Sequence, residues 1–238
     1  MRLKTTIIAL GILFLGGWFL YGRNPQKTVL NTATPSARST PTPTVSLPLK
    51  ILLDVPFTAQ APLGHWEDPR QQDGCEEASI LMAIHWANRT KFTSLEEAEQ
   101  SIITLAEYKN HPIDTSAADT ANLMRDYFNY SKIRVVYNIT RKDIQKELAA
   151  GNLVLVPAWG QKLLNPNFTP PGPVTHMLVI KGYDDGTQEF ITNDPGTRKG
   201  EGFRYNYSVM QNAFFDYPTG DHELLITKRS AMIVIEKD

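Results

Sequence analysis

Cys75 is the residue of this chain whose type and setting first suggest chemistry. It is the sole cysteine among 238 residues, and it follows Asp73 and Gly74 where a turn leads into a helical pattern. The start of a helix exposes unpaired backbone N–H groups and the positive end of the helix dipole, which both favour a thiolate over a thiol. The alternative interpretation is a buried, unreactive thiol, because free cysteines are among the most buried residues. A lone cysteine also excludes an internal disulfide.

A histidine and an aspartate follow in the order that a cysteine nucleophile needs. His176 lies near the start of an apolar, β-branched run that predicts a buried strand. Asp194 ends a second short strand before a Pro-Gly turn, so a hairpin would bring it beside His176. Alone, such a histidine is more often a packed core residue, and Asp-Pro-Gly is most often only a turn. Together they supply a base for the thiol and a carboxylate that orients the base.

With these motifs the chain resembles the papain-like cysteine peptidases of the bacteriocin-processing kind, whose domain trims double-glycine leader peptides. The resemblance covers about residues 50–237 and rests on four segments: Val55–Gln60, Asp73–Ser79, Thr175–Asp184 and Asn193–Gly196. It implies a papain-like fold, cysteine peptidase activity on a peptide or protein substrate, and no cofactor. It also implies catalytic roles for Cys75, His176 and Asp194.

In this family a glutamine upstream of the nucleophile donates a hydrogen bond in the oxyanion hole. Gln60 matches that position best, and Gln72, three residues before Cys75, is the other assignment. The chain departs from many members at Glu76, where they have glycine. We expect Glu76 to point about 100° around the helix from the thiol, with solvent screening its charge, so that a Cys75–His176 ion pair prevails. Glu76 and Glu77 would then serve mainly to cap the helix and compensate its dipole.

Apolar patterning predicts helices in the first half of the chain and strands in the second. Residues 76–88 are apolar on most sides, which predicts a buried central helix. Helices are also expected from residue 93 towards 108 and at 117–128, 141–149 and 209–215, and strands at 133–137, 153–158, 175–183, 189–192 and 231–236. The predicted class is therefore α+β, with a buried helix carrying Cys75 packed on an antiparallel sheet carrying His176 and Asp194.

The remaining histidines and the aromatic residues give weaker signals. No two histidines have the spacing of a metal site, so we assign no metal; the four are His65, His85, His111 and His222. Trp66, Trp159 and Phe168 could line a substrate groove, although core packing is the usual role of scattered aromatic residues.

The first 50 residues differ in composition from the rest. Residues 7–22 are uncharged and largely apolar, follow Arg2 and Lys4, and suit a single membrane crossing. A cleaved secretory signal is the alternative, but no Ala-x-Ala pattern follows, so we expect residues 1–22 to be a transmembrane signal anchor. Residues 23–50, rich in Pro, Thr and Ser, predict an extended linker. We expect a single-pass membrane protein with its catalytic domain, residues 51–238, outside the cytoplasm, or a secreted protein if the segment is cleaved.

The net charge and the motifs together limit the classes of function that the sequence supports. A formal net charge of −1 gives no electrostatic reason to expect nucleic acid binding. The predicted reaction is hydrolysis of a peptide bond through a thioester on Cys75. Two alternatives stay open: a cell-wall peptidoglycan amidase or endopeptidase of the NlpC or CHAP kind, and a catalytically silent module that binds a peptide.

Overall fold

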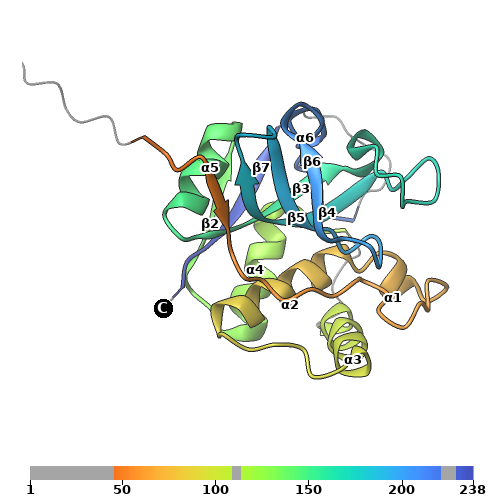
Figure 1. The fold of residues 1–238 in the computed structure, drawn as a ribbon. Coiled ribbons are helices and arrows are strands. Elements are labelled where there is room, and N and C mark those ends of the chain that lie inside the picture. Colours follow the sequence, from red (N-terminus) through yellow and green to blue (C-terminus); the bar gives the residue numbers. More distant parts are fainter. Residues whose placement is uncertain (1–45, 109–113, 221–228, 238) are drawn as a thin grey trace, which may run out of the picture. The chain divides into compact units, whose positions relative to one another are not determined.

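A seven-stranded antiparallel sheet lies at the centre of the computed structural model, which describes residues 46–108, 114–220 and 229–237 (Figure 1). The strand order is β2-β7-β3-β4-β5-β6, and β1 pairs with β4 beside this path. The strands are β1 (Lys50–Leu52), β2 (Ile133–Tyr137), β3 (Leu153–Trp159), β4 (Thr175–Asp184), β5 (Glu189–Asn193), β6 (Glu201–Asn206) and β7 (Ala231–Ile235). The described residues belong to one unit, Val45–Asp238.

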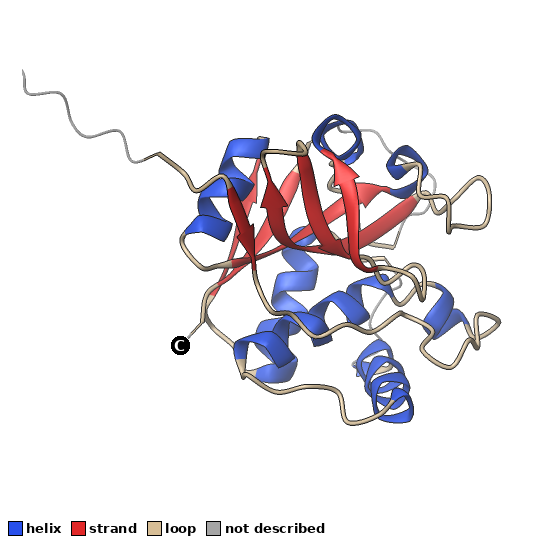
Figure 2. Ribbon diagram, viewed as in Figure 1, coloured by secondary structure: helices blue, strands red, loops and turns tan. Residues whose placement is uncertain are grey.

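Both faces of the sheet are covered by helices (Figures 1 and 2). The helices α2 and α4 pack on one face, with α3 against α2, and α5 and α6 pack on the other face. The helices are α1 (Pro69–Gln72), α2 (Cys75–Ala87), α3 (Leu95–Ala106), α4 (Ala117–Phe128), α5 (Arg141–Ala149) and α6 (Tyr207–Ala213), with a 3₁₀ turn η2 (Gly160–Leu163).

The central strands are apolar at nearly every position because they serve two cores. In β3, Leu153 and Leu155 face α2, whereas Val154 and Val156 face α5 and α6. All four are fully buried. Burial of such a side chain stabilises the fold by about 1.5–3 kcal/mol, which explains why the run is continuous and not alternating.

Helix α2 is buried along almost its whole length, as its pattern predicts; His85 alone among its 13 residues is not buried. The hydroxyl of Ser79 donates a hydrogen bond of 3.4 Å to the carbonyl of Met177, which ties α2 to β4. The helix begins directly after Gly74, where a Cβ atom would lie 2.7 Å from the carbonyl oxygen of Arg70. Glycine is therefore required by the close approach of α1, and Cys75 occupies the first helical position.

The predicted α+β class is confirmed, and the elements at 117–128, 133–137 and 141–149 have their expected bounds. Three short elements, α1, β1 and β6, were not expected, because their sequences are short or polar. The last predicted helix is displaced by two residues, to Tyr207–Ala213. Lys50, assigned to the linker, instead pairs with Asp184 in the sheet and forms a 2.9 Å ion pair with its carboxylate.

Within the described ranges, no helix has the length and apolar character needed to cross a membrane. The predicted membrane anchor at residues 1–22 and most of the predicted linker lie outside those ranges.

Candidate active site

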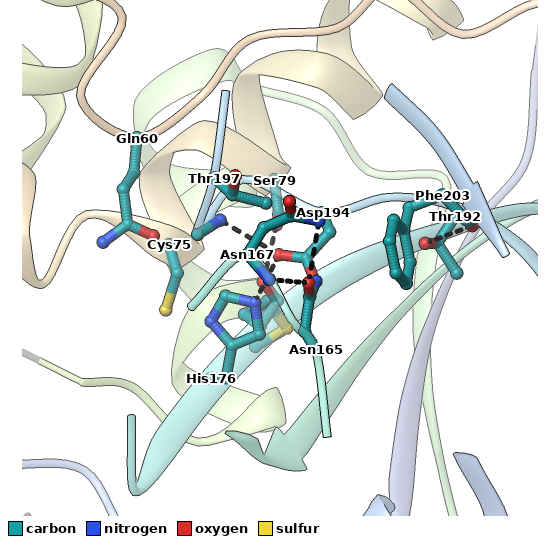
Figure 3. Close-up of polar contacts among 12 residues, drawn as sticks. Gln60, Cys75, Ser79, Asn165, Asn167, His176, Thr192, Asp194, Thr197 and Phe203 are labelled. Carbon is teal, nitrogen blue, oxygen red and sulfur yellow. Dashed lines mark hydrogen bonds and ion pairs between the residues drawn. The ribbon is translucent and has the colours of Figure 1, made fainter. Parts of the chain in front are cut away.

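A cavity of about 520 Å³ lies where the first turn of α2 meets the beginning of the central strand β4. Residues from four separate parts of the chain reach it, among them Gln60, Cys75, Asp114, Phe168 and His176. The fold thus brings a lone cysteine and a strand histidine, 101 positions apart in the chain, into one space. Figure 3 shows the Cys75 sulfur and the His176 ring on the same side of the site.

His176 and Asp194 are joined by a hydrogen bond of 2.8 Å between Nε2 and Oδ1, with both side chains buried. The antiparallel pairing of β4 with β5 carries them to the same end of the hairpin, where Val179 is level with Asn193. Because Nε2 is bound to Asp194, the other ring nitrogen, Nδ1, is turned towards the cysteine side (Figure 3). This placement of His176 beside Asp194 is the one expected from the hairpin.

Asp194 is surrounded by hydrogen-bond donors. Tyr205 donates its hydroxyl to Oδ2 at 2.5 Å, the Asn165 amide donates to the same oxygen at 3.2 Å, and the backbone N–H of Gly196 donates to Oδ1 at 3.0 Å. Burial alone raises the pKa of Asp194, but His176, Tyr205 and Gly196 together outweigh burial and leave the pKa below its ordinary value. The carboxylate is therefore ionised and suited to stabilise an imidazolium.

The imidazole of His176 is also fixed by packing. The Phe168 ring lies 5.3 Å from it in an edge-on arrangement. A Cβ atom at Gly196 would lie 2.9 Å from Cε1 of His176 and equally close to Phe168. Glycine at this position therefore allows the Asp194 turn to close against the ring.

Cys75 is 3% exposed, and its thiol donates a hydrogen bond of 3.0 Å to Oε2 of Glu76. The other oxygen of Glu76 accepts hydrogen bonds from the Tyr217 hydroxyl at 2.6 Å and from the Thr115 backbone N–H at 3.0 Å. The expectation that Glu76 points away from the thiol into solvent is wrong. Because α2 is buried on nearly all sides, its first turn has no solvent-facing direction for this carboxylate, which turns to its neighbours.

This contact also changes the acidity of the thiol. Burial, followed by the charges of Glu76 and Asp114, raises the pKa of the Cys75 thiol well above its ordinary value. A backbone hydrogen bond from Met177 acts in the opposite direction but is the smaller effect. The expected ease of thiolate formation is therefore not a property of this arrangement, which favours the protonated thiol that donates to Glu76.

Gln60 and Gln72, the two candidate oxyanion donors, lie together at the cavity. The side-chain amide of Gln60 donates to the backbone carbonyl of Gln72 at 2.5 Å, and its backbone N–H donates to Pro195 at 2.9 Å. Gln60 is buried, and no described residue donates to its Oε1, whereas Gln72 is exposed. The backbone carbonyl of Gln72 thus holds the side-chain amide of Gln60 in place. This hydrogen bond uses one of the two hydrogens on Nε2 of Gln60.

Several contributors to the site were not anticipated. Tyr205 and Asn165 bind Asp194, and Asp114 lines the cavity, but no motif in the sequence marks any of them. Of the three aromatic candidates, Trp66 and Phe168 line the cavity. Trp159 instead packs under the Lys162 ammonium group at 4.9 Å. In the part of the chain that the structure describes, no group of three or more His, Cys, Asp or Glu residues is placed to hold a metal ion.

Comparison with models of known protein families assigns this chain to a family. Residues 52–217 match the model of the Peptidase_C39 like family, and the chain belongs to that family. It is a cysteine peptidase with a papain-like fold of the C39 type. None of the curated proteins matches it.

The comparison with solved structures found two similar chains among others. One, described as a C39-like peptidase from Bacillus anthracis, is 16% identical, with a TM-score of 0.52 over 79% of this chain and 98% of that chain. The other is Xylellain, a cysteine protease from Xylella fastidiosa, which is 14% identical, with a TM-score of 0.43 over 81% of this chain and 87% of that chain.

Proposed function

We propose that this peptidase hydrolyses peptide bonds with Cys75 as nucleophile, His176 as base and acid, and Asp194 as the group that orients His176. The observation that carries the proposal is the buried 2.8 Å bond from His176 to an ionised Asp194, at a cavity that Cys75 also lines. Nucleophile, base and orienting carboxylate are the parts of a covalent acyl-transfer site.

In the proposed reaction the Cys75 proton moves to Nδ1 of His176, and the sulfur attacks the substrate carbonyl. The imidazolium then gives the proton to the departing amine, leaving a thioester on Cys75. Water, deprotonated by His176, attacks the thioester and releases the acid and the free thiol. Asp194 stabilises the imidazolium in both halves because it accepts the Nε2 hydrogen throughout.

Gln60 and the Cys75 backbone N–H are the proposed oxyanion donors. The Cys75 N–H is at the first helical position, where no intrahelical partner exists for it. The Gln60 amide is held at the cavity by Gln72. In measured cases one such donor is worth about 2.7–4 kcal/mol of transition-state stabilisation.

A thiol-directed covalent probe on the purified domain tests this function directly. We expect stoichiometric labelling of Cys75 with parallel loss of hydrolysis of a labelled peptide, and neither labelling nor hydrolysis in Cys75→Ala. Labelled peptidoglycan serves as the parallel substrate. Hydrolysis of peptidoglycan alone would favour a cell-wall enzyme, and labelling without hydrolysis of either substrate would favour a binding module.

We also propose that residues 1–22 anchor the protein in a membrane, with the peptidase domain outside the cytoplasm. Support comes from the uncharged stretch at residues 7–22, the basic residues before it and the Pro, Thr and Ser-rich segment after it. Mass spectrometry of membrane-extracted protein should find residues 1–22 retained. Recovery of a soluble form beginning near residue 24 would show cleavage instead.

A further inference from the structure

The hydrogen bond from the Cys75 thiol to Glu76 is a contact that hydrolysis does not use. Attack on a carbonyl requires the proton of Cys75 to pass to Nδ1 of His176, but here that proton is directed at Oε2 of Glu76 at 3.0 Å. Donor and acceptor are adjacent in the chain and both are buried. The thiol thus donates to an acceptor on α2, whereas the proposed base, His176 on β4, lines the same cavity.

Glu76 is built into its position. Only 1% of the residue is exposed, and its other carboxylate oxygen accepts the Tyr217 hydroxyl at 2.6 Å and the Thr115 N–H at 3.0 Å. These two donors come from segments 39 and 141 positions away from Glu76 in the chain. Because both engage Oε1, Oε2 is left facing the thiol, so the orientation of the carboxylate is fixed by groups outside α2.

We infer that Glu76 is a positioning residue that keeps the Cys75 thiol protonated and directed away from His176 in the resting enzyme. This inference rests on the function proposed above. In the working enzyme the S–H bond rotates from Glu76 to His176, the proton transfers to Nδ1, and the sulfur becomes the thiolate of a Cys75–His176 ion pair. Cys75 loses this proton and His176 gains it, while Glu76 gives up only its hydrogen bond.

The charged and titratable groups around the thiol act in different directions. Glu76 from α2 and Asp114 from the segment before α4 disfavour a thiolate, and both contribute to the raised pKa of the thiol. Tyr217 stays protonated, because burial and the Glu76 charge raise its pKa well above the ordinary value. Asp73 lines the same cavity, as does His176 on β4, the proposed base.

Glu76→Gln tests the inference with little change of shape. With its oxygen kept on Tyr217 and Thr115, the glutamine presents its NH₂ to the sulfur, so a charged acceptor becomes a neutral donor. We expect the pH profile of Cys75 alkylation by iodoacetamide, an uncharged probe, to move to lower pH. The alkylation rate at pH 6.5 should rise by about tenfold or more, since one pKa unit corresponds to that factor below the pKa.

Glu77→Gln is the matched control, because it makes the same exchange at the next buried position of α2. Burial, followed by the Glu76 charge, raises the pKa of Glu77 well above its ordinary value, and the thiol of Cys75 donates its hydrogen bond to Glu76. We expect its alkylation profile to follow the wild type. An unchanged profile in Glu76→Gln, or the same shift in both variants, would overturn the inference.

Tyr217→Phe supplies a second test of opposite sign, which decides alone if Glu76→Gln does not fold. Loss of the hydroxyl removes a donor from Oε1 of Glu76 and leaves more negative charge for the thiol proton. Alkylation at pH 6.5 should then slow by about threefold, the factor for roughly 0.7 kcal/mol, within the usual range for one hydrogen bond. An unchanged or faster rate would contradict the inference.

The two proposals fail separately. If Cys75→Ala retained hydrolysis, the proposed catalytic role of Cys75 would be wrong. Alkylation of the other variants would still measure the effect of Glu76 on the acidity of the thiol. If Cys75→Ala were inactive but the Glu76→Gln profile did not move, the catalytic role would stand and the inference about Glu76 would fall.

Discussion

Two buried carboxylates lie beside the cavity residues Cys75 and His176, one on helix α2 and one at the end of β5, and they have opposite effects on those residues. Asp194, after β5, accepts the Nε2 hydrogen of His176 and hydrogen bonds from Tyr205, Asn165 and Gly196. Glu76, in the first turn of α2, accepts the thiol hydrogen of Cys75. Asp194 therefore favours the positively charged form of His176, and Glu76 disfavours the negatively charged form of Cys75.

The difference shows that a carboxylate is not activating in itself. Its effect depends on whether the neighbouring group becomes positive or negative during the reaction. Beside His176 a negative charge lowers the energy of the imidazolium that the proposed mechanism requires. Beside Cys75 the same charge raises the energy of the thiolate. In the proposed mechanism Asp194 thus prepares His176 for the reaction, whereas Glu76 holds Cys75 in a resting state.

Cys75→Ala is the strongest way to break this comparison, because it removes the group on which both sides act. We expect hydrolysis to fall to background, since no other thiol exists in the chain. The fold should persist, because alanine is a good helix former and the substitution removes only the sulfur atom from the first position of α2. Peptide hydrolysis and the thermal unfolding midpoint measure the two halves of this prediction. Residual hydrolysis well above background would reject Cys75 as nucleophile.

Asp194→Asn should have the next largest effect, a loss of about 10³- to 10⁴-fold in kcat with a measurable remainder. The amide keeps the shape but can present a donor to Nε2, which places His176 in the wrong tautomer and removes the charge that stabilises the imidazolium. KM should change little. The steady-state parameters of purified variant and wild type decide this, and a decrease below about tenfold would show that the sheet side is not as important as proposed.

Gln60→Ala should reduce kcat/KM by about 10²- to 10³-fold if its amide donates to the oxyanion. The matched control is Gln72→Ala, which removes an exposed side chain but keeps the backbone carbonyl that holds Gln60. We expect the control to stay within about threefold of the wild type. The reverse ranking of the two variants would assign the donor role to Gln72.

Tyr205→Phe sharpens the comparison by removing one donor from Asp194 while leaving the carboxylate. Its hydroxyl donates at 2.5 Å to Oδ2, and Asn165 donates to the same oxygen. Loss of one such bond, about 1–2 kcal/mol, should lower kcat by roughly five- to thirtyfold, far less than Asp194→Asn. Equal losses in both variants would mean that Tyr205 does more than support the carboxylate.

The smallest expected effect is on the pH dependence of stability. The folded-state pKa of Asp194 lies below its ordinary value, so the ionised group contributes stability above the unfolded pKa of about 3.9. That contribution is lost as the pH falls through the folded pKa. Unfolding midpoints between pH 6 and pH 2.5 should therefore fall more steeply for the wild type than for Asp194→Asn. Parallel curves would show that Asp194 is not preferentially ionised in the fold.

The elements that carry the site were predictable to different degrees. Helix α2 and the strands β3 and β4 were recognisable because each is a long apolar run, and the pattern of a long run is clear even where its ends are uncertain. The elements α1 and β6 were not, because their short polar sequences are ordered by neighbours: Gly74 against Arg70, and β6 against β5. Asn165 and Tyr205 share this property, since their roles exist only through contact with Asp194.

The sequence by itself determined the order Cys75, His176, Asp194, the α+β class and the position of the cysteine at a helix start. These follow from residue type and local periodicity, which need no knowledge of distant contacts. Only the tertiary structure decided the direction of Glu76, because that depends on Tyr217 and Thr115, which lie far from it in the chain. Because the first turn of α2 is buried, the Glu76 carboxylate does not reach solvent. Glu76 was expected to compensate the helix dipole, and it instead accepts a hydrogen bond from the Cys75 thiol.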